Sequence, residues 1–479
     1  MSSPTPRAVM VWVHGGGWYR GGAVKFNMWK ITTEAQIIGV SIQYRLGALG
    51  FLSTGSTVIP GNYAMLDQVL ALKWVKDNIA SFGGDVNNIA IYGQSAGGAS
   101  VSYHTLSPLS KGLFKRVIMQ SGSALGFWTS RTDASKYAYQ LAKNVNCPVS
   151  QNQSHNAHSD MRMIECLRKL PYRSIVDGSN FNLSLTSYSD DAVWSPVVDH
   201  HFLVGEPSRL IDDASFLQSV GFNEYDMMFG VNNAEGGIMV HLAMQYGDLH
   251  NISGLDIISK PGYFQGEYLH TILKQIYGVS LNVDIDVVEF ESQIYVANQQ
   301  PYPLFNQTAV SVLEQMLNTA FLMSAYRIAR ARDLNKSSGK TFLYFFDHYP
   351  TYAKKFYITG ISHGDDINYS FGINDTLIRL KYNITGNISQ EEYLLSDKFV
   401  QILAQFGKTG NPNSAVEDKL PTVWTEFSGP DWSYLCFITN MEVKTRLRQR
   451  EAELWLDLIP KLHRDVYMYC DDKQNRNLP

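Results

Sequence analysis

Apolar and polar positions alternate in blocks over the first hundred residues. Residues 9–13 and 37–44 form apolar runs, as is typical of strands buried on both faces of a sheet. Residues 62–82 place apolar side chains at steps of three and four, which predicts an amphipathic helix. A third apolar run at residues 88–92 follows a Phe-Gly-Gly-Asp turn. This β-α-β order predicts a mostly parallel sheet.

The rest of the chain carries the same kinds of signal. Apolar runs at residues 117–120, 225–231 and 341–346 predict further strands, and residues 447–462 predict a C-terminal helix. No internal repeat, low-complexity segment or linker rich in Pro and Ser divides the sequence. We therefore expect an α/β protein with helices on both faces of a central sheet, in which residues 1–479 form a single domain.

Composition excludes several classes of protein. The 479 residues are 45% hydrophobic and 12% aromatic, which is enough for a sizeable core. The 40 basic and 44 acidic residues leave a formal net charge of −4, so nothing points to nucleic acid as a partner. No apolar run reaches the roughly 18 residues of a transmembrane helix, so we expect no membrane span in this chain.

The strongest chemical signal is the pentapeptide GQSAG at residues 93–97, directly after the predicted strand at residues 88–92. Between a strand and a helix, Gly-x-Ser-x-Gly is the nucleophile elbow of α/β hydrolases. In so tight a reversal, side chains at the two glycine positions would collide with the neighbouring strand and helix. A chance Gly/Ser turn is the alternative, but the context favours Ser95 as a nucleophile.

A second signal is HGGGW at residues 14–18, at the end of the first predicted strand. Ester hydrolysis creates an oxyanion, which is stabilised by backbone N–H groups already aimed at it. Glycines let the backbone approach the substrate closely. No Lys-Ser or Lys-Thr pair follows, which argues against a nucleotide-binding loop. Together with the elbow, the segment predicts an oxyanion loop.

Four segments resemble the type-B carboxylesterase and cholinesterase family: VWVHGGGW at residues 11–18, YRLGALGFL at 44–52, NYAMLDQVLALKWVKDNIASFGGD at 62–85 and GQSAGGASV at 93–101. The likeness extends over residues 8–463. It implies the α/β-hydrolase fold and an oxyanion hole made by the backbone N–H groups of Gly16, Gly17 and Ala96.

The resemblance also nominates the other catalytic residues. In α/β hydrolases the serine, the acid and the histidine follow one another in the chain. FGVNNAEG at residues 229–236 resembles the acid-bearing segment of the family and nominates Glu235. SHGDD at residues 362–366 resembles its histidine loop and nominates His363. His348 is the main alternative base, but the motif does not surround it.

These three residues define an expected mechanism. Neutral His363 takes the proton of Ser95 as the serine attacks an ester carbonyl, and returns it to the departing alcohol. Glu235 holds the imidazole tautomer and stabilises the imidazolium. Water then hydrolyses the acyl-enzyme by the same route. The partner is a small-molecule ester, and neither a metal ion nor an organic cofactor is required.

Departures from the choline-binding members of the family narrow the class of ester that we expect as substrate. Gln94 replaces the glutamate that cholinesterases carry before the nucleophile, and no aromatic residue follows Glu235 and Gly236. Recognition of a quaternary ammonium depends on aromatic faces and negative charge. We therefore expect uncharged esters to be better substrates than choline esters. Trp128 resembles an acyl-pocket aromatic, or is a core residue.

Cysteines and sequons favour an extracellular protein. Cys147 and Cys166 resemble a short disulfide loop of the family, whereas Cys436 and Cys470 either pair with each other, pair with another chain or stay free. Nine Asn-x-Ser/Thr sequons occur where about four are expected by chance. We expect a glycoprotein that is secreted or lies on the extracellular face of the membrane.

The competing hypothesis is a neuroligin-like or neurotactin-like adhesion protein on the same fold. Such relatives typically lack the nucleophile, whereas Ser95, Glu235 and His363 are all present here. Residues 225–236 and the C-terminal helix look somewhat neuroligin-like. A homodimer through that helix is therefore a further hypothesis.

The sequence begins abruptly for an α/β hydrolase. Residues 9–13 would form the third strand of the family's sheet and residues 37–44 the fourth, whose usual outer neighbour is missing. An apolar open edge invites aggregation. We therefore expect an N-terminally truncated form, without its first strands and without an upstream secretion signal or membrane anchor.

Overall fold

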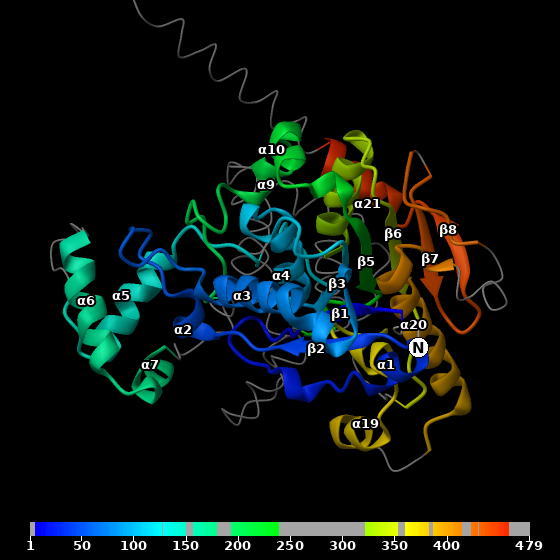
Figure 1. Ribbon diagram of the computed structural model, residues 1–479, viewed down its shortest axis with the longest axis horizontal. Coiled ribbons are helices and arrows are strands. Elements are labelled where there is room, and N and C mark those ends of the chain that lie inside the picture. Colours follow the sequence, from blue (N-terminus) through cyan, green and yellow to red (C-terminus); the bar gives the residue numbers. More distant parts are fainter. Residues whose placement is uncertain are drawn as a thin grey trace, which may run out of the picture.

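One sheet of eight strands organises the computed structural model (Figure 1). The structure describes residues 5–126, 128–149, 157–179, 193–238, 321–352, 360–382, 387–413, 423–429 and 431–458. In spatial order the strands are β2 (Ile38–Ile42), β1 (Arg7–Val13), β3 (Gly84–Gln94), β4 (Arg116–Gln120), β5 (Asp226–Asn232), β6 (Thr341–Phe346), β7 (Ser433–Phe437) and β8 (Glu442–Thr445). All neighbours are parallel except β7 and β8, which are antiparallel.

Both faces of the sheet are buried. Along β1, Val9, Val11 and Val13 enter one apolar cluster, whereas Met10 and Trp12 enter the other, because alternate side chains of a strand point to opposite faces. The first cluster includes side chains of α3 (Tyr63–Asn78) and α4 (Ala96–Thr105). The second includes those of α1 (Trp29–Ala35), α18 (Ile367–Ser370) and α20 (Gln390–Thr409). The predicted α/β class, with helices on both faces, is confirmed.

The six predicted strands are all present, with small differences at their ends. The helix predicted over residues 62–82 is α3 followed by the 3-10 turn η2 (Ile79–Phe82). The predicted C-terminal helix is α21 (Gln449–Glu453) and the π-helical turn η7 (Leu454–Leu458), and residues 459–462 lie outside the described part. Strands β7 and β8 were not predicted. The outermost strand β8 is mostly exposed, so its sequence EVKT lacks the apolar run of a central strand.

The remaining helices connect these elements. They are η1 (Ala23–Lys25), α2 (Gly47–Phe51), η3 (Pro108–Ser110), α5 (Ala134–Asn144), α6 (Ala157–Lys169), α7 (Tyr172–Gly178), α9 (Pro207–Leu210), α10 (Ala214–Ser219), η4 (Phe222–Glu224) and α19 (Asp375–Tyr382). None of the helices in the described ranges is both long and apolar enough to cross a membrane.

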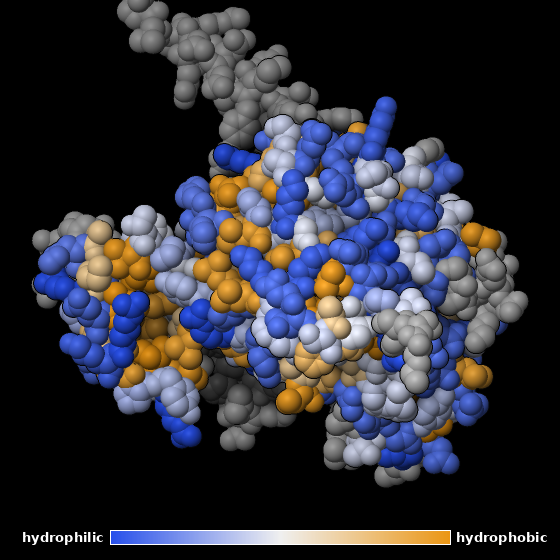
Figure 2. Space-filling model, viewed as in Figure 1, coloured by the Kyte–Doolittle hydropathy of each residue, from blue (hydrophilic) through white to orange (hydrophobic). Residues whose placement is uncertain are grey.

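A lobe of α5, α6 and α7 lies beside the body of the molecule (Figure 1). A disulfide joins Cys147, just after α5, to Cys166 on α6. This confirms the pairing that the family resemblance implies. Figure 2 shows apolar surface on the lobe, where Tyr172 is among the exposed large side chains. Of the other cysteines, Cys436 is a buried free thiol in β7, and Cys470 lies outside the described residues.

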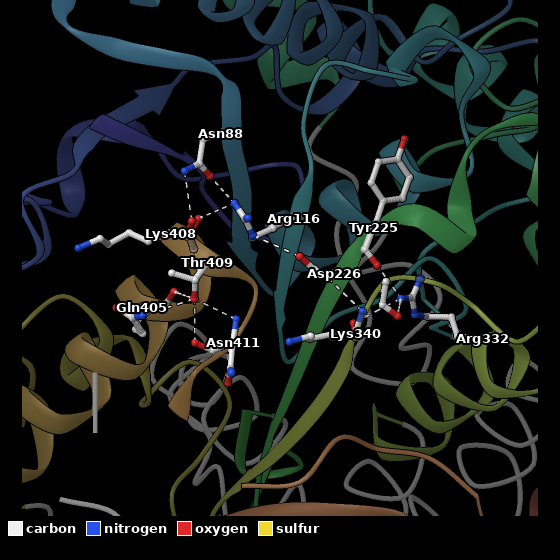
Figure 3. A network of polar contacts seen from close by, with 12 residues as sticks. Asn88, Arg116, Tyr225, Asp226, Arg332, Lys340, Gln405, Lys408, Thr409 and Asn411 are labelled. Atoms are coloured by element: carbon white, nitrogen blue, oxygen red, sulfur yellow. Dashed lines mark hydrogen bonds and ion pairs between the residues drawn. The ribbon is translucent and has the colours of Figure 1, made fainter. Parts of the chain in front are cut away.

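Two buried arginines join the N-terminal ends of the central strands. Arg116, the first residue of β4, forms an ion pair of 3.3 Å with Asp226, the first residue of β5. The guanidinium of Arg116 also donates to Asn88 on β3 (Figure 3). Asp226 in turn accepts from the backbone N–H of Lys340, just before β6. This network ties four neighbouring strands together at their N-terminal ends.

Arg332 completes the network beside Tyr225 and Lys340 (Figure 3). Its guanidinium donates to the carbonyl oxygens of Phe222, Tyr225 and Gly339 at 2.6–2.8 Å, and its Nε to Thr341 Oγ1 at 2.8 Å. Burial lowers its pKa to about 10, so the side chain still carries its charge at neutral pH. One cation thereby satisfies three buried carbonyls.

We predict that Arg332→Met destabilises the fold by about 3 kcal/mol or more, because several buried acceptors lose their only charged donor. The matched control is Arg327→Met. Arg327 lies on the same helical segment, partly exposed, and contacts Ser208 and Asp212. Its loss is expected to cost less than about 1 kcal/mol. Chemical unfolding of both variants measures the difference, and equal midpoints would contradict this role of Arg332.

Candidate active site

Ser95 occupies the turn between β3 and α4. Its backbone has φ 58° and ψ −125°, and its N–H donates to the carbonyl of Gln120 at 2.8 Å. The turn brings backbone atoms so close that a Cβ on Gly97 would lie 2.0 Å from the Val13 carbonyl oxygen. A Cβ on Gly93 would lie 2.4 Å from the Gly97 carbonyl. Both positions therefore require glycine, and the half-buried serine is presented at the carboxyl end of the sheet.

Ser95, His363 and Glu235 form one chain of contacts. Ser95 Oγ lies 2.8 Å from His363 Nε2, and His363 Nδ1 lies 2.6 Å from Glu235 Oε2. Gln94 Nε2 lies 3.4 Å from the same His363 Nε2. The three residues are 268 and 128 positions apart in sequence, so only the fold brings them together. All three follow the carboxyl ends of strands, where ligands bind in open α/β sheets.

A short bridge aligns the acid segment with the histidine segment. Ala234 and Ser362 form an isolated parallel β-bridge, and Ala234 N–H donates to Ile361 O at 3.1 Å. The Asn233 side chain accepts from Ile361 N–H at 2.8 Å. Residues next to Glu235 and His363 are thus paired through the backbone. The bridge explains why both side chains point to the same place.

Glu235 is fully buried, and two donors hold the carboxylate oxygen that does not contact His363. Ser121 Oγ donates to Glu235 Oε1 at 2.6 Å, and the Asn232 N–H donates to the same oxygen at 2.7 Å. The other oxygen is left for His363. Sequence reasoning missed Ser121. Its position directly after strand β4, within QSGS, was the only available signal.

A second buried carboxyl group lies behind Glu235. Asp366 is fully buried and accepts from Gln120 Nε2 at 3.1 Å and from Asn232 Nδ2 at 3.3 Å. Burial, followed by the nearby charge of Glu235, raises the pKa of Asp366 to about 7. Near neutral pH this group therefore exchanges a proton beside the His363–Glu235 pair. Asp366 stands in the SHGDD motif, but the sequence gives no sign of its burial.

The glycine loop lies against Ser95. A Cβ on Gly15 would come within 3.1 Å of Ser95 Cβ, and Gly16 and Gly17 have φ of 112° and 61°. Ala96 N–H is the first amide of α4, where a helix leaves its N–H groups without intrahelical partners. The loop and the helix N-terminus thus meet at Ser95, and the oxyanion hole stays a prediction.

Aromatic rings form a wall next to His363. The Phe321 ring lies 4.9 Å from the His363 ring and 6.2 Å from Trp128, which in turn lies 5.3 Å from Trp18. Trp128 is 9% exposed and belongs to the core cluster, yet it is also part of this wall. Phe321 was not identified from the sequence, because no local motif surrounds it.

His348 does not join the site. Its Nε2 lies 2.9 Å from Glu392 Oε2 on α20, and Tyr369 OH donates to the same carboxylate at 2.5 Å. Thr351 donates to the other Glu392 oxygen through its N–H and its hydroxyl. The alternative base is thus engaged in a separate buried cluster.

Within the described ranges no group of three or more His, Cys, Asp or Glu is arranged to hold a metal ion.

The sheet order and the strand–turn–helix at Ser95 define a protein of the α/β-hydrolase fold. The chain belongs to the carboxylesterase family, whose model matches residues 1–455. The family resemblance found in the sequence is therefore confirmed.

Relatives within the family carry different names. The chain is 30% identical to human bile salt-activated lipase over 463 residues, which are 93% of this chain and 56% of that protein. It is 29% identical to the rat bile salt-activated lipase, with 97% and 73% covered. It is 28% identical to human neuroligin-2, with 96% and 52% covered. The chain thus spans little more than half the length of these human relatives.

The raised pKa of Asp366 predicts a particular pH dependence of stability. Unfolding lets this carboxyl release its proton near its ordinary pKa of 3.8, whereas the folded protein keeps the proton until about pH 7. Rising pH therefore costs the folded state up to about 4 kcal/mol across this window. In Asp366→Asn that loss is absent. Unfolding free energies of both proteins at pH 5 and pH 8 measure it, and parallel pH profiles would contradict the assignment.

Proposed function

We propose that this protein is a serine hydrolase of carboxylic esters, with Ser95 as nucleophile, His363 as base and Glu235 as acid. The observation that carries the proposal is the continuous chain of contacts from Ser95 Oγ through His363 to a buried Glu235. Structural histidines need a partner for one or both ring nitrogens. They rarely combine a strained serine on one nitrogen with a buried carboxylate on the other.

Each residue has one task in the reaction. Ser95 Oγ attacks the ester carbonyl while His363 Nε2 takes its proton, and the alcohol then leaves with that proton. Glu235 keeps the hydrogen of His363 on Nδ1 and stabilises the imidazolium. The Ser121 hydroxyl and the Asn232 N–H hold the Glu235 carboxylate in place for this contact with His363. Water then attacks the acyl-enzyme with the same proton transfers in reverse.

The negative charge of the tetrahedral intermediate falls on the former carbonyl oxygen. We assign its stabilisation to the backbone N–H groups of Gly16, Gly17 and Ala96. The positive φ of both glycines and the position of Ala96 at the start of α4 support the assignment. Preorganised donors of this kind contribute about 3–4 kcal/mol each to lowering the barrier.

The substrate proposed is an uncharged small-molecule ester. Gln94 next to His363 is neutral, and the wall of Trp128 and Phe321 beside His363 is apolar. Such a wall favours an apolar acyl or alcohol group. The bile salt-activated lipases among the relatives carry the name of an enzyme that acts on esters, which agrees with this substrate class.

An adhesion or binding protein is the second candidate, because neuroligin-2 is almost as similar to this chain as the lipases are. Binding by itself does not require Ser95, His363 and Glu235 to be in contact. The intact contacts therefore favour the hydrolase. Reaction of Ser95 with a covalent probe separates the two candidates.

We further propose an extracellular location. The Cys147–Cys166 disulfide suits an oxidising compartment. Among the sequons in the described ranges, Asn374 and Asn387 are exposed, whereas Asn335 and Asn368 are half-buried. The sequons at Asn152, Asn182, Asn251, Asn306 and Asn383 lie outside those ranges.

The direct test is titration with a fluorescent alkyl fluorophosphonate. We expect stoichiometric labelling of the purified protein at Ser95, found by peptide mass spectrometry, together with turnover of 4-nitrophenyl acetate. Ser95→Ala is expected to abolish both while leaving the circular dichroism spectrum and the melting temperature close to those of the parent, because the Oγ is not a core contact. A folded parent protein that neither reacts with the probe nor hydrolyses the ester would sink the proposal.

Two histidine variants test the identity of the base. His363→Gln is expected to lower kcat by at least about 10³-fold, since among the described residues His363 is the base that contacts Ser95 Oγ. His348→Gln retains a donor for Glu392 and should keep kcat within about threefold of the parent. Comparable losses in both variants would mean that the base is assigned wrongly.

A further inference from the structure

Three consecutive residues of the glycine loop have positive φ. Gly16 and Gly17 tolerate this conformation, but Trp18 adopts it too, with φ 60°. For a residue with a Cβ the left-handed region costs roughly 1–2 kcal/mol. Contacts of Trp18, those of its side chain among them, must outweigh this cost. Those contacts therefore set the backbone of the two glycines before it.

Several contacts hold Trp18 in place. Trp18 is fully buried, and its ring lies 5.8 Å from that of Phe51 and 5.3 Å from that of Trp128. Its Nε1–H donates to Ser100 Oγ at 2.9 Å. The backbone carbonyl of Trp18 accepts from the Gly47 N–H at 2.8 Å. Of these contacts, the bond to Ser100 is the directional one that involves the side chain.

Ser100 lies on the helix that also carries the other half of the site. It stands in α4, four residues after Ala96 and five after Ser95, and is fully buried. The Trp18–Ser100 hydrogen bond spans 82 residues of sequence. It therefore joins the loop that carries Gly16 and Gly17 to the helix that carries Ala96 and Ser95.

A chain of buried polar groups fixes the direction of the Ser100 hydroxyl. Burial lowers the pKa of His104 to about 3, so its ring is neutral. Ser110 Oγ lies 2.8 Å from His104 Nδ1, and Gln68 Oε1 lies 3.0 Å from His104 Nε2. When Ser110 donates to Nδ1, the Nε2–H donates to Gln68 Oε1. Gln68 Nε2 then donates to Ser100 Oγ at 3.4 Å.

The Ser100 hydroxyl then has a partner for its hydrogen and for both of its lone pairs. Its oxygen accepts from Trp18 Nε1 and from Gln68 Nε2, which occupies both lone pairs. Its hydrogen is directed at Met65 Sδ, 3.9 Å away. The indole is thus fixed in position by a hydroxyl that has no freedom to turn.

We propose that Ser100 is a positioning residue of the oxyanion hole, which holds the Gly16–Gly17 loop in register with the Ala96 N–H through the Trp18 indole. The inference rests on the proposed function of that site. Oxyanion donors act only when they are aimed at the charge that develops in the transition state, and small displacements cost much of their effect. Loss of the Ser100 hydroxyl should therefore lower kcat and leave KM almost unchanged.

The test compares Ser100→Ala with Ser102→Ala, which removes another buried hydroxyl from the same helix. For 4-nitrophenyl acetate, Ser100→Ala is expected to lower kcat by about 10- to 100-fold with KM within twofold. Ser102→Ala should lower kcat less than threefold. A similar fall in kcat for both would overturn the proposal, since it would indicate general loosening of α4.

Trp18→Phe supplies the partner variant for a double-mutant cycle. It removes the indole donor but keeps a ring in the aromatic wall. If the hydrogen bond is the coupling, Ser100→Ala combined with Trp18→Phe should lower kcat no further than the larger single change does. Multiplied single effects would show that the two residues act independently, and would overturn the proposal.

Hydrogen exchange gives a readout that does not depend on activity. In Ser100→Ala the backbone amides of residues 15–20 should exchange at least tenfold faster than in the parent, while those of β3 stay unchanged. Unchanged exchange in this loop overturns the positioning role even if the protein is an esterase. Faster exchange in a protein without esterase activity would support the role of Ser100 and count against the proposed function instead.

Discussion

The close contact between the Ser95 turn and strand β1 is the constraint on which the site depends. Gly97 lies so near the Val13 carbonyl that no side chain fits between them, and Gly93 is equally close to Gly97. Because β1 continues directly into the glycine loop, the same contact brings that loop against the serine. Ser95, the proposed nucleophile, and the proposed oxyanion donors are therefore parts of one packing arrangement.

The two ends of the sheet differ in the charged groups that they bury, with arginines at one end and carboxyl groups at the other. At the N-terminal ends of the strands, Arg116 and Arg332 satisfy buried acceptors, with Asp226 as counter-charge. At the carboxyl ends, two buried carboxyl groups, Glu235 and Asp366, lie close together beside the imidazole of His363. A second full negative charge there is costly, which explains why Asp366 retains its proton to a higher pH. The proton on Asp366 removes one negative charge from the surroundings of Glu235.

Within the carboxylesterase family, overall similarity does not separate enzymes from proteins with other roles. This chain is 30% identical to a bile salt-activated lipase and 28% identical to neuroligin-2, and the difference is too small to assign an activity. The information lies in the local arrangement at Ser95, His363 and Glu235, and in the polar contacts of Ser121, Asn232 and Ser100 that support it. Ser121 and Asn232 contact Glu235 directly, and Ser100 contacts Trp18 at the end of the glycine loop.

The sequence by itself determined the sheet strands from β1 to β6, the elbow at Ser95 and the glycine loop, because these depend on local periodicity and on glycines at fixed offsets. It also nominated Glu235 and His363, but only through family resemblance, since nothing local distinguishes a catalytic histidine from His348. Tertiary structure alone decided which histidine faces the serine. Likewise it decided that Asp366 is buried, that Phe321 contacts His363, and that Ser100 supports Trp18. Each of these is a contact between segments far apart in the chain. Their burial and partners follow from packing rather than from neighbouring residues.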